Sequence, residues 1–221
     1  MKRYKQNEGF NEKLNKYRGE QVIKYAKGKT CLEIGCGEGQ ITKLLVKSFK
    51  EVTVIDMDKQ HIDAISENTH IISKYIGKFE DMLLSHRYDY VVVTNVLEHV
   101  DDVDMFLNLL RTVCHKKTRI FISVPNCASF NRILGFDIGM LKNVEQLGKH
   151  DKKVGHKRMF DIWQFEDNIT DYFKIVKSGT MIYKPFPNNI MNTLPKEVIN
   201  KCFNYKMENR GAEIYAICKL K

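Results

Sequence analysis

The sequence predicts an α/β domain in which a mainly parallel sheet is covered by helices on both faces. Strand-like and helix-like segments alternate along the chain, without internal repeats or low-complexity segments. A buried strand ends in a glycine-rich turn at Gly35, Gly37 and Gly39, and the next strand ends in Asp56. Such alternation is typical of strands joined by crossover helices, which build a parallel sheet.

The first half of the chain supplies three of the expected strands. The strand at 30–34 ends in the glycines, which allow positive φ and a close approach of the backbone to a ligand. Residues 40–49 then show helical spacing, with Ile41, Leu44, Leu45 and Ser48 on one side. The other elements expected here are helices at 10–27 and 59–67, and strands at 51–56 and near 73–77.

The second half continues the alternation until residue 125. A strand at 88–95 precedes a helix at 103–114, whose inward residues are predicted to be Phe106, Leu107, Leu110 and Val113. A strand at 118–124 is ended by Pro125, and residues 126–160 are expected to be irregular. Because that segment is longer than usual loops, we expect a lid or an inserted cap. A helix at 160–172 and strands at 173–183 and 212–220 complete the prediction.

Length and composition fit one domain over residues 1–221, with an N-terminal helical lid (1–28) and a cap insertion (126–160). A chain of 221 residues with 43% hydrophobic content can bury a full core. Its longest apolar runs, such as 91–93 and 120–124, are far shorter than the ~20 residues of a membrane span. The N-terminus has no apolar core behind its positive charges, so neither a membrane span nor a signal peptide is expected.

The cysteines indicate neither a zinc site nor a disulfide framework. None of the six forms a C-x-x-C pair, and several lie inside expected strands, at positions 31, 36, 114, 127, 202 and 218. A reducing cytoplasm fits best. The acidic pairs Glu80–Asp81 and Asp101–Asp102 lack a third ligand at a recognisable spacing, so no metal is expected.

The formal net charge of +9 suggests an anionic partner, either nucleic acid, an anionic surface or an anionic small substrate. The densest cationic cluster is Lys149–Arg158, within the expected cap insertion. It is either a solvated loop or a substrate-facing loop whose cations hold a phosphate or a carboxylate.

The spacing of the glycines separates two classes of nucleotide-like ligand. The dinucleotide pattern G-x-G-x-x-G requires a glycine at position 40, where this chain has Gln40. The observed E-x-G-x-G-x-G, beginning at Glu33, resembles the first motif of class I S-adenosylmethionine-dependent methyltransferases. Glu33 and Glu38 would repel a pyrophosphate but suit an ammonium group and a sulfonium. The alternative is an ordinary strand-to-helix turn with glycines for packing.

Two later motifs extend the resemblance over roughly residues 17–220. Asp56 lies 21 positions after Gly35, and 89–100 reads Asp-Tyr-Val-Val-Val-Thr-Asn-Val-Leu-Glu-His-Val before an aspartate-rich helix start. These features are similar to small-molecule class I methyltransferases, including ubiquinone-biosynthesis and sugar-methylating groups. The resemblance implies a Rossmann-like sheet of seven strands in order 3-2-1-4-5-7-6 with strand 7 antiparallel, and 173–220 would supply strands 6 and 7.

The same resemblance implies S-adenosylmethionine as the cofactor and assigns residues to it. Gly35 and Gly37 would pass under the methionine moiety, Asp56 would accept hydrogen bonds from the ribose hydroxyls, and Met57 would contact adenine. Asp56 could instead cap the following helix. The full implied set is Glu33, Gly35, Gly37, Gly39, Asp56, Met57, Phe79, Glu80, Asn95 and Leu97, with Asp81 and His99 close by.

The acceptor is expected to be a small molecule rather than a nucleic acid. Enzymes that methylate base amino groups carry an Asn/Asp-Pro-Pro-aromatic element, where this chain has Asn95-Val-Leu-Glu98, and it has no long stretch of interleaved basic and aromatic residues. Segments 155–160, 184–189 and 211–215 are similar to methyltransferases of surface-polysaccharide and other glycan biosynthesis. That similarity implies a hydroxyl of a sugar, nucleotide-sugar or phosphorylated precursor, and a quinone-like metabolite is the alternative.

A hydroxyl acceptor requires a base, and histidine is the natural choice near neutral pH. His156 is the first candidate because it lies in the cap insertion beside cations; His150 and His99 follow. His156 could equally be a loop-packing histidine, and a histidine in the position of His99 is more often structural than catalytic. Candidate acceptor-binding residues are Tyr17, Arg18, Lys153, Lys157 and Arg158, joined by Tyr4 and Lys152. An amphipathic covering helix would explain Tyr4, Tyr17 and Arg18 equally well.

Two other function classes remain open at this level. A nicotinamide-dependent oxidoreductase would share the strand–glycine–helix opening, although the missing glycine at position 40 argues against it. A non-catalytic partner protein with a methyltransferase fold would usually have lost the glycines or the ribose acid, and both are present here. The sequence identifies neither the acceptor nor the oligomeric state.

Overall fold

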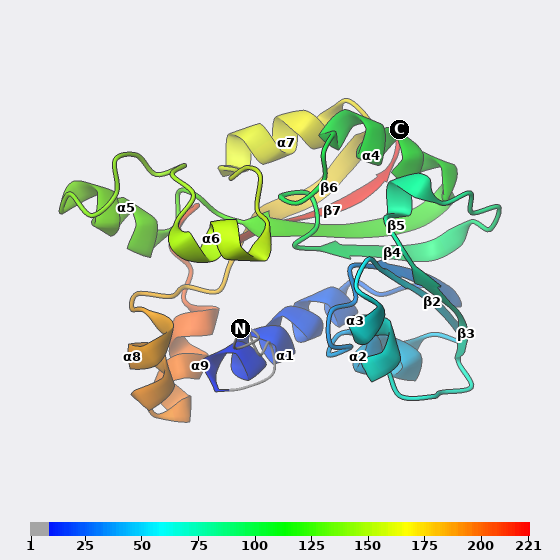
Figure 1. The fold of residues 1–221 in the computed structure, drawn as a ribbon, viewed down its shortest axis with the longest axis horizontal. Coiled ribbons are helices and arrows are strands. Elements are labelled where there is room, and N and C mark those ends of the chain that lie inside the picture. The colour runs from blue at the N-terminus through cyan, green and yellow to red at the C-terminus, as the bar shows by residue number, and fades with distance from the viewer. Residues whose placement is uncertain (1–8) are drawn as a thin grey trace.

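A single mixed sheet forms the centre of the computed structural model, which describes residues 9–221. Within this range the strand order is β3-β2-β1-β4-β5-β7-β6, as the family resemblance implied (Figure 1). The parallel strands are β1 (Thr30–Ile34), β2 (Glu51–Asp56), β3 (Ile71–Ile76), β4 (Tyr88–Thr94) and β5 (Cys114–Pro125). Strand β7 (Glu213–Leu220) runs antiparallel between β5 and β6 (Phe173–Met181), which confirms the predicted orientation.

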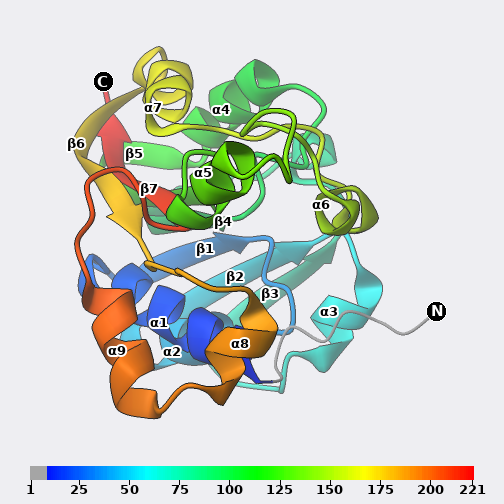
Figure 2. The same cartoon turned by 90° about the vertical axis from the view of Figure 1, so that its left-hand side faces the viewer.

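Helices cover both faces of the sheet, as predicted (Figure 2). One face carries α1 (Phe10–Lys24), α2 (Thr42–Ser48) and α3 (Lys59–Ala64). The other face carries α4 (Val103–Thr112) and α7 (Ile162–Thr170), with the short 3₁₀ helix η1 (Phe79–Asp81) against α4. Residues 1–8 of the expected lid, Tyr4 included, lie outside the described residues.

The helix α4 shows how the sequence pattern produces this packing. Its predicted inward residues Phe106, Leu107, Leu110 and Val113 are all buried, which confirms the apolar stripe. Burying each such side chain contributes about 1.5–3 kcal/mol. The helix begins where the Asp102 carboxylate accepts a hydrogen bond from the Met105 N–H (2.9 Å).

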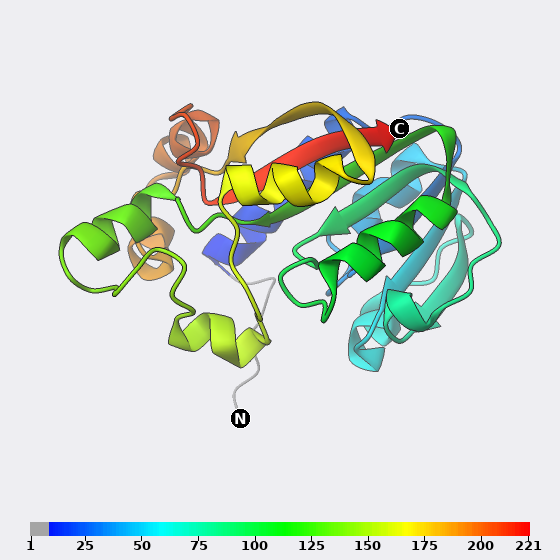
Figure 3. The ribbon, with the colours of Figure 1, turned by 90° about the horizontal axis from the view of Figure 1, so that it is seen from above.

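The expectation that residues 126–160 are irregular was wrong, because two short helices lie there: α5 (Phe130–Asp137) and α6 (Lys149–Val154). Both lie beyond the end of the sheet (Figure 3). Neither helix contains a buried residue, and both are shorter than the window of about 11–18 residues in which helical periodicity is recognised. At α6 the Asp151 carboxylate accepts the Gly148 N–H (2.8 Å), and Gly155 ends the helix in the left-handed conformation (φ +86°).

Two further helices lie in residues 184–211, for which the sequence analysis named no element. They are α8 (Asn188–Thr193) and α9 (Lys196–Asn204), and each follows a proline, Pro187 or Pro195. Both pack on the α1 side of the sheet, where the Phe10 and Phe203 rings are 5.6 Å apart. Proline is favoured at helix starts, so a signal was present. Within residues 9–221, none of the helices combines the length and apolar character that a bilayer span requires.

Candidate active site

A cavity of about 840 Å³ opens at the carboxyl ends of the parallel strands. Its lining includes Gly35 and Gly37 after β1, Asp56 and Met57 after β2, and Asn95 after β4. Strands β2 and β4 flank β1 on opposite sides, so the cavity lies where the strand order reverses. Ligands of open α/β sheets bind at this position, and the volume is within the range of small-molecule sites.

Asp56 holds the glycine turn in place. Its Oδ2 accepts the Gly37 N–H (2.9 Å), and its Oδ1 accepts the Asp58 N–H (2.9 Å) and lies 3.1 Å from Nδ1 of His61. Burial acts to raise the pKa of Asp56, but these hydrogen bonds outweigh it and hold the pKa below its usual value. The cavity therefore presents a carboxylate. Asp58, rather than Asp56, caps α3 by accepting the Gln60 N–H (2.8 Å).

Three residues of the implied cofactor set do not line the cavity. Glu33 is only 1% exposed, and its Oε2 accepts the Thr42 hydroxyl (2.6 Å). Burial raises the pKa of Glu33 to about 8. Leu97 belongs to the core, and a side chain at Gly39 (φ +76°) would approach Ile65.

The remaining cofactor candidates face the same space. Met57 is 65% exposed, and Phe79 and Glu80 lie in the lining beside it. Asn95 has a positive φ of 53°, uncommon for a residue other than glycine. Its buried Oδ1 has no hydrogen-bond partner within the described part of the chain. Strained backbone and unpaired polar atoms are typical of functional sites.

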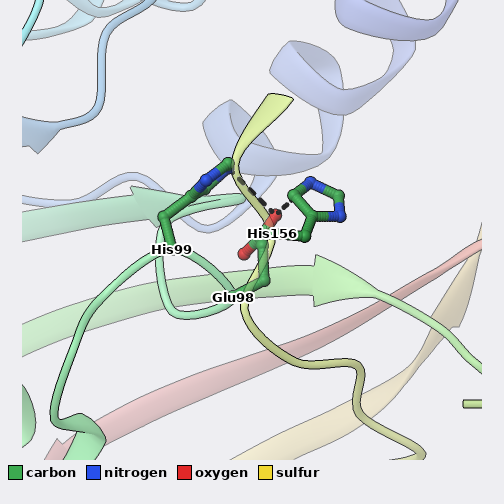
Figure 4. A group of neighbouring side chains, drawn as sticks. All are labelled: Glu98, His99 and His156. Carbon is green, nitrogen blue, oxygen red and sulfur yellow. Dashed lines mark ion pairs between the residues drawn. The ribbon is translucent and has the colours of Figure 1, made fainter. Parts of the chain in front are cut away.

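One glutamate and two histidines form a cluster in another part of the lining. We call Glu98, His99 and His156 the Glu98 cluster (Figure 4). Oε1 of Glu98 lies 4.0 Å from Nε2 of His99 and 3.9 Å from Nε2 of His156. Glu98 is 0% exposed, and burial raises its pKa to about 8. Burial and the neighbouring His156 lower the pKa of His99.

His150 and Asp151 line the cavity next to this cluster. The Asp151 carboxylate lies 3.4 Å from Nδ1 of His156, and its contact with His156 is the main cause of a lowered pKa at Asp151. The structure thus brings all three predicted catalytic histidines to one cavity.

Of the five predicted acceptor-binding residues, two line the cavity, and both have partners. Lys157 is paired with Asp101, and Arg18 with Glu213. The other three lie outside the lining. Arg158 donates to the carbonyls of Leu97, Val100 and Asp101, Lys153 is exposed, and the Tyr17 ring packs 5.1 Å from that of Phe203.

Two lining residues far along the chain, Lys184 and Glu213, lie in the segments 184–189 and 211–215 that the sequence analysis singled out, but it gave neither residue a role. Lys184 is partly buried and donates to Oδ1 of Asn188 (2.9 Å), and burial lowers its pKa. Glu213, at the start of β7, is buried and accepts the Nε–H of Arg18 (2.9 Å). Lys184 precedes α8, and the proline at the start of that helix does not show that the Lys184 side chain lines the cavity.

Comparisons with known proteins agree with this geometry. A family model described as a methyltransferase domain matches residues 8–175. A ubiquinone biosynthesis O-methyltransferase of Aeromonas salmonicida is 30% identical over 135 residues, which cover 57% of this chain and 56% of the relative. The chain thus spans about half the length of this curated relative.

Solved structures share the fold at low sequence identity. A methyltransferase from Thermotoga maritima, described as a possible histamine N-methyltransferase, has a TM-score of 0.67 at 17% identity and covers 94% of this chain and 88% of its own. The N-methyltransferase NodS from Bradyrhizobium japonicum, with S-adenosyl-L-homocysteine bound, has a TM-score of 0.58 at 13% identity, over 96% and 87%. Family model, fold and glycine motif coincide, and the chain belongs to the class I S-adenosylmethionine-dependent methyltransferase family.

Proposed function

We propose that this protein transfers the methyl group of S-adenosylmethionine to a hydroxyl of a small anionic acceptor, such as a sugar, a nucleotide-sugar or a phosphorylated precursor. The observation that carries the proposal is one continuous cavity with two chemically different groups of residues. The glycine turn and Asp56 line it, and so do Lys184 and Glu98, which share the Glu213 carboxylate as an electrostatic neighbour. Methyl transfer requires the two substrates in line within one water-poor space.

The cofactor residues supply groups that match each part of S-adenosylmethionine. The Asp56 carboxylate suits the ribose hydroxyls, and the exposed side chain of Met57 offers an apolar surface for adenine. Oδ1 of Asn95 offers a carbonyl oxygen near the glycine turn, where the positively charged part of the cofactor is expected.

The cavity supports an anionic acceptor through Lys184. The other lysines of the described lining, Lys78 and Lys157, are both paired with the Asp101 carboxylate. Lys184 instead has an amide partner in Asn188, with the Glu213 carboxylate as an electrostatic neighbour. An ammonium group in this setting can still pair with a phosphate or a carboxylate. We therefore assign to Lys184 the role that the sequence suggested for Lys153, Lys157 and Arg158.

The reaction needs one proton acceptor. As the acceptor oxygen bonds to the methyl carbon, the carbon–sulfur bond breaks and its electron pair stays on sulfur, leaving S-adenosylhomocysteine. The hydroxyl proton has to leave, and His156 is the proposed base. Asp151, which lies beside Nδ1 of His156, would fix the orientation of the imidazole ring. Nε2 of His156 then lies on the side of Glu98.

A second candidate is an aromatic hydroxyl of a quinone precursor, because the Aeromonas relative is a ubiquinone biosynthesis O-methyltransferase. This acceptor would use the same cofactor residues and the same base. It differs from the first candidate in how the acceptor would be held: an aromatic ring needs an apolar surface to pack against, whereas an anionic acceptor needs the charge of Lys184.

Binding and transfer assays test the proposal in two steps. We expect calorimetry to detect binding of S-adenosylhomocysteine to the protein and no binding of NAD. Labelled S-adenosylmethionine is then offered with three acceptor panels: nucleotide-sugars and sugar phosphates, prenylated catechols, and primary amines. Label transfer to the first panel is expected. Transfer confined to the amines would refute hydroxyl methylation, and cofactor binding without transfer to any panel would favour a non-catalytic partner protein.

A further inference from the structure

The Glu98 cluster contains a buried carboxyl group that lacks a hydrogen-bond partner in the described part of the chain. Glu98 is 0% exposed, and neither of its side-chain oxygens has a hydrogen-bond partner among the described residues. A buried polar group of this kind is costly unless something compensates it. Its ion-pair contacts are to two imidazoles, His99 at 4.0 Å and His156 at 3.9 Å.

From this arrangement we propose that Glu98, His99 and His156 bind one divalent first-row transition ion, such as Co²⁺, Mn²⁺ or Zn²⁺. One carboxylate and two imidazoles are a donor set that such ions favour. The three donor atoms lie within 4.8 Å of one another. Ligands about 2.1 Å from a tetrahedral ion are about 3.4 Å apart, so small side-chain rotations would close the site. The fourth position would face the cavity that all three residues line.

Groups around the cluster are arranged as they are around metal ligands in other proteins. Asp151 lies 3.4 Å from Nδ1 of His156 on the side away from Glu98, and His99 has a backbone hydrogen bond with Gly155. A ligating histidine almost always has such a partner at its other ring nitrogen. Asp151 is itself held by the Gly148 N–H (2.8 Å) and Arg132 (3.6 Å).

The two segments that carry the cluster are also fixed to each other. The Lys157 N–H donates to the Glu98 carbonyl (2.8 Å). Arg158 donates to the carbonyls of Leu97 (3.1 Å) and Val100 (2.6 Å). Although His156 is 57 residues after His99, the backbone therefore holds both imidazoles ready for one ion, and little ordering is left for binding.

The inference deepens the proposed function and rests on it only for its consequence. A cation here would lower the pKa of a coordinated acceptor hydroxyl, as metals do for bound water. The hydroxyl proton would then pass to water, and His156 would serve as a ligand in place of a free base. Metal binding itself requires neither the cofactor nor an acceptor, so it can be tested even if the acceptor assignment fails.

The test is titration of the purified full chain with Co²⁺ alone, followed by calorimetry and visible absorption. We expect one ion per chain, with absorption of a nitrogen and oxygen donor set and no cobalt–thiolate band. Glu98→Gln and His156→Gln should each weaken binding at least about 100-fold, and Asp151→Asn about 10–100-fold. His150→Gln is the matched control, because it changes a histidine of the same lining outside the cluster.

A second readout separates a metal site from a structural carboxylate. Without metal, Glu98→Gln should leave the melting temperature unchanged or raise it, because it removes an unpaired buried acid. Saturating Co²⁺ should raise the melting temperature of the parent but not of Glu98→Gln. The proposal is overturned if Co²⁺, Mn²⁺ and Zn²⁺ all fail to bind at millimolar concentration. It is equally overturned if binding survives in Glu98→Gln and His156→Gln.

Discussion

Asp56 combines two tasks that the sequence could not separate. Its carboxylate accepts the N–H groups of Gly37 and Asp58, so it shapes the turn, and it also lines the cavity. A carboxylate has about four lone-pair positions, and Gly37, Asp58 and His61 use three of them, so one ribose hydroxyl can bind directly and the second requires His61 to move away from Oδ1. The position of Asp56 at the end of a strand was predictable from the alternation, whereas its bonds to the turn depend on the fold.

Asp56→Ala should lower the affinity for S-adenosylhomocysteine at least tenfold. The substitution removes two charge-assisted hydrogen bonds to ribose, each worth about 1.5–3 kcal/mol before solvent compensation. Calorimetry provides the measurement, and Asp56→Asn is the matched control, because its amide can still accept one of these bonds. The assignment fails if Asp56→Ala binds as tightly as the parent while its melting curve shows a folded protein.

Lys184→Met should raise the Michaelis constant for an anionic acceptor by about tenfold or more and leave that for S-adenosylmethionine unchanged. The variant keeps the aliphatic chain and removes the charge, and a hydrogen bond to a charged group is worth about 1.5–3 kcal/mol. Steady-state kinetics give both constants. Lys78→Met is the matched control, because Lys78 lines the same cavity but is already paired with Asp101. Equal effects of the two substitutions would argue against a specific role for Lys184.

Among the helices and strands, those with a clear pattern of apolar residues facing the core were the ones that the sequence predicted. Strand β4 is nearly all apolar and α4 has an apolar stripe, and both were found where the pattern placed them. In contrast α5 and α6 bury none of their residues, and with eight and six residues both are shorter than the window of about 11–18 residues in which helical periodicity is recognised. The Glu98 cluster was unpredictable for a related reason, since His156 reaches Glu98 only through the path of α6.

The end of α6 gives a prediction about a single backbone position. Gly155 has a φ of +86°, and a Cβ there would lie 3.8 Å from Nδ1 of His99, an ordinary contact. Gly155→Ala should therefore cost about 1–2 kcal/mol through backbone strain alone, which lowers the melting temperature by roughly 2–8 °C in a chain of this size. Gly135→Ala, inside α5 and with ordinary contacts to Leu141, should leave the melting temperature unchanged or raise it. An equal loss in both variants would show that conformation at Gly155 is not the cause.

For the whole molecule, the central strand contains a titratable group that acts against stability as pH rises. Glu33 pairs with β2 on one side and β4 on the other, through Val54 and Val92. Its Oε1 is buried without a hydrogen-bond partner in the described range. Burial, together with the nearby Asp56 charge, raises its pKa to about 8, although the Thr42 hydroxyl acts in the opposite direction.

From the raised pKa of Glu33 we predict how the free energy of unfolding depends on pH. The pKa of an unfolded glutamate is about 4.3, so between that pH and about 8 the folded chain keeps a proton that the unfolded chain has released. The contribution of Glu33 is therefore full below about pH 4 and declines as pH rises to 8, by at most about 1.4 kcal/mol per pH unit. Asp56 and Asp89 have lowered pKa values, so they stabilise the folded chain above their unfolded pKa and lose that contribution only as pH falls through their folded pKa.

Urea unfolding at pH 5.5 and pH 8, without cofactor, should show a smaller free energy of unfolding at pH 8. The decline of this free energy between the two pH values should be smaller in Glu33→Gln. If parent and variant decline in parallel, Glu33 does not hold its proton in the folded protein.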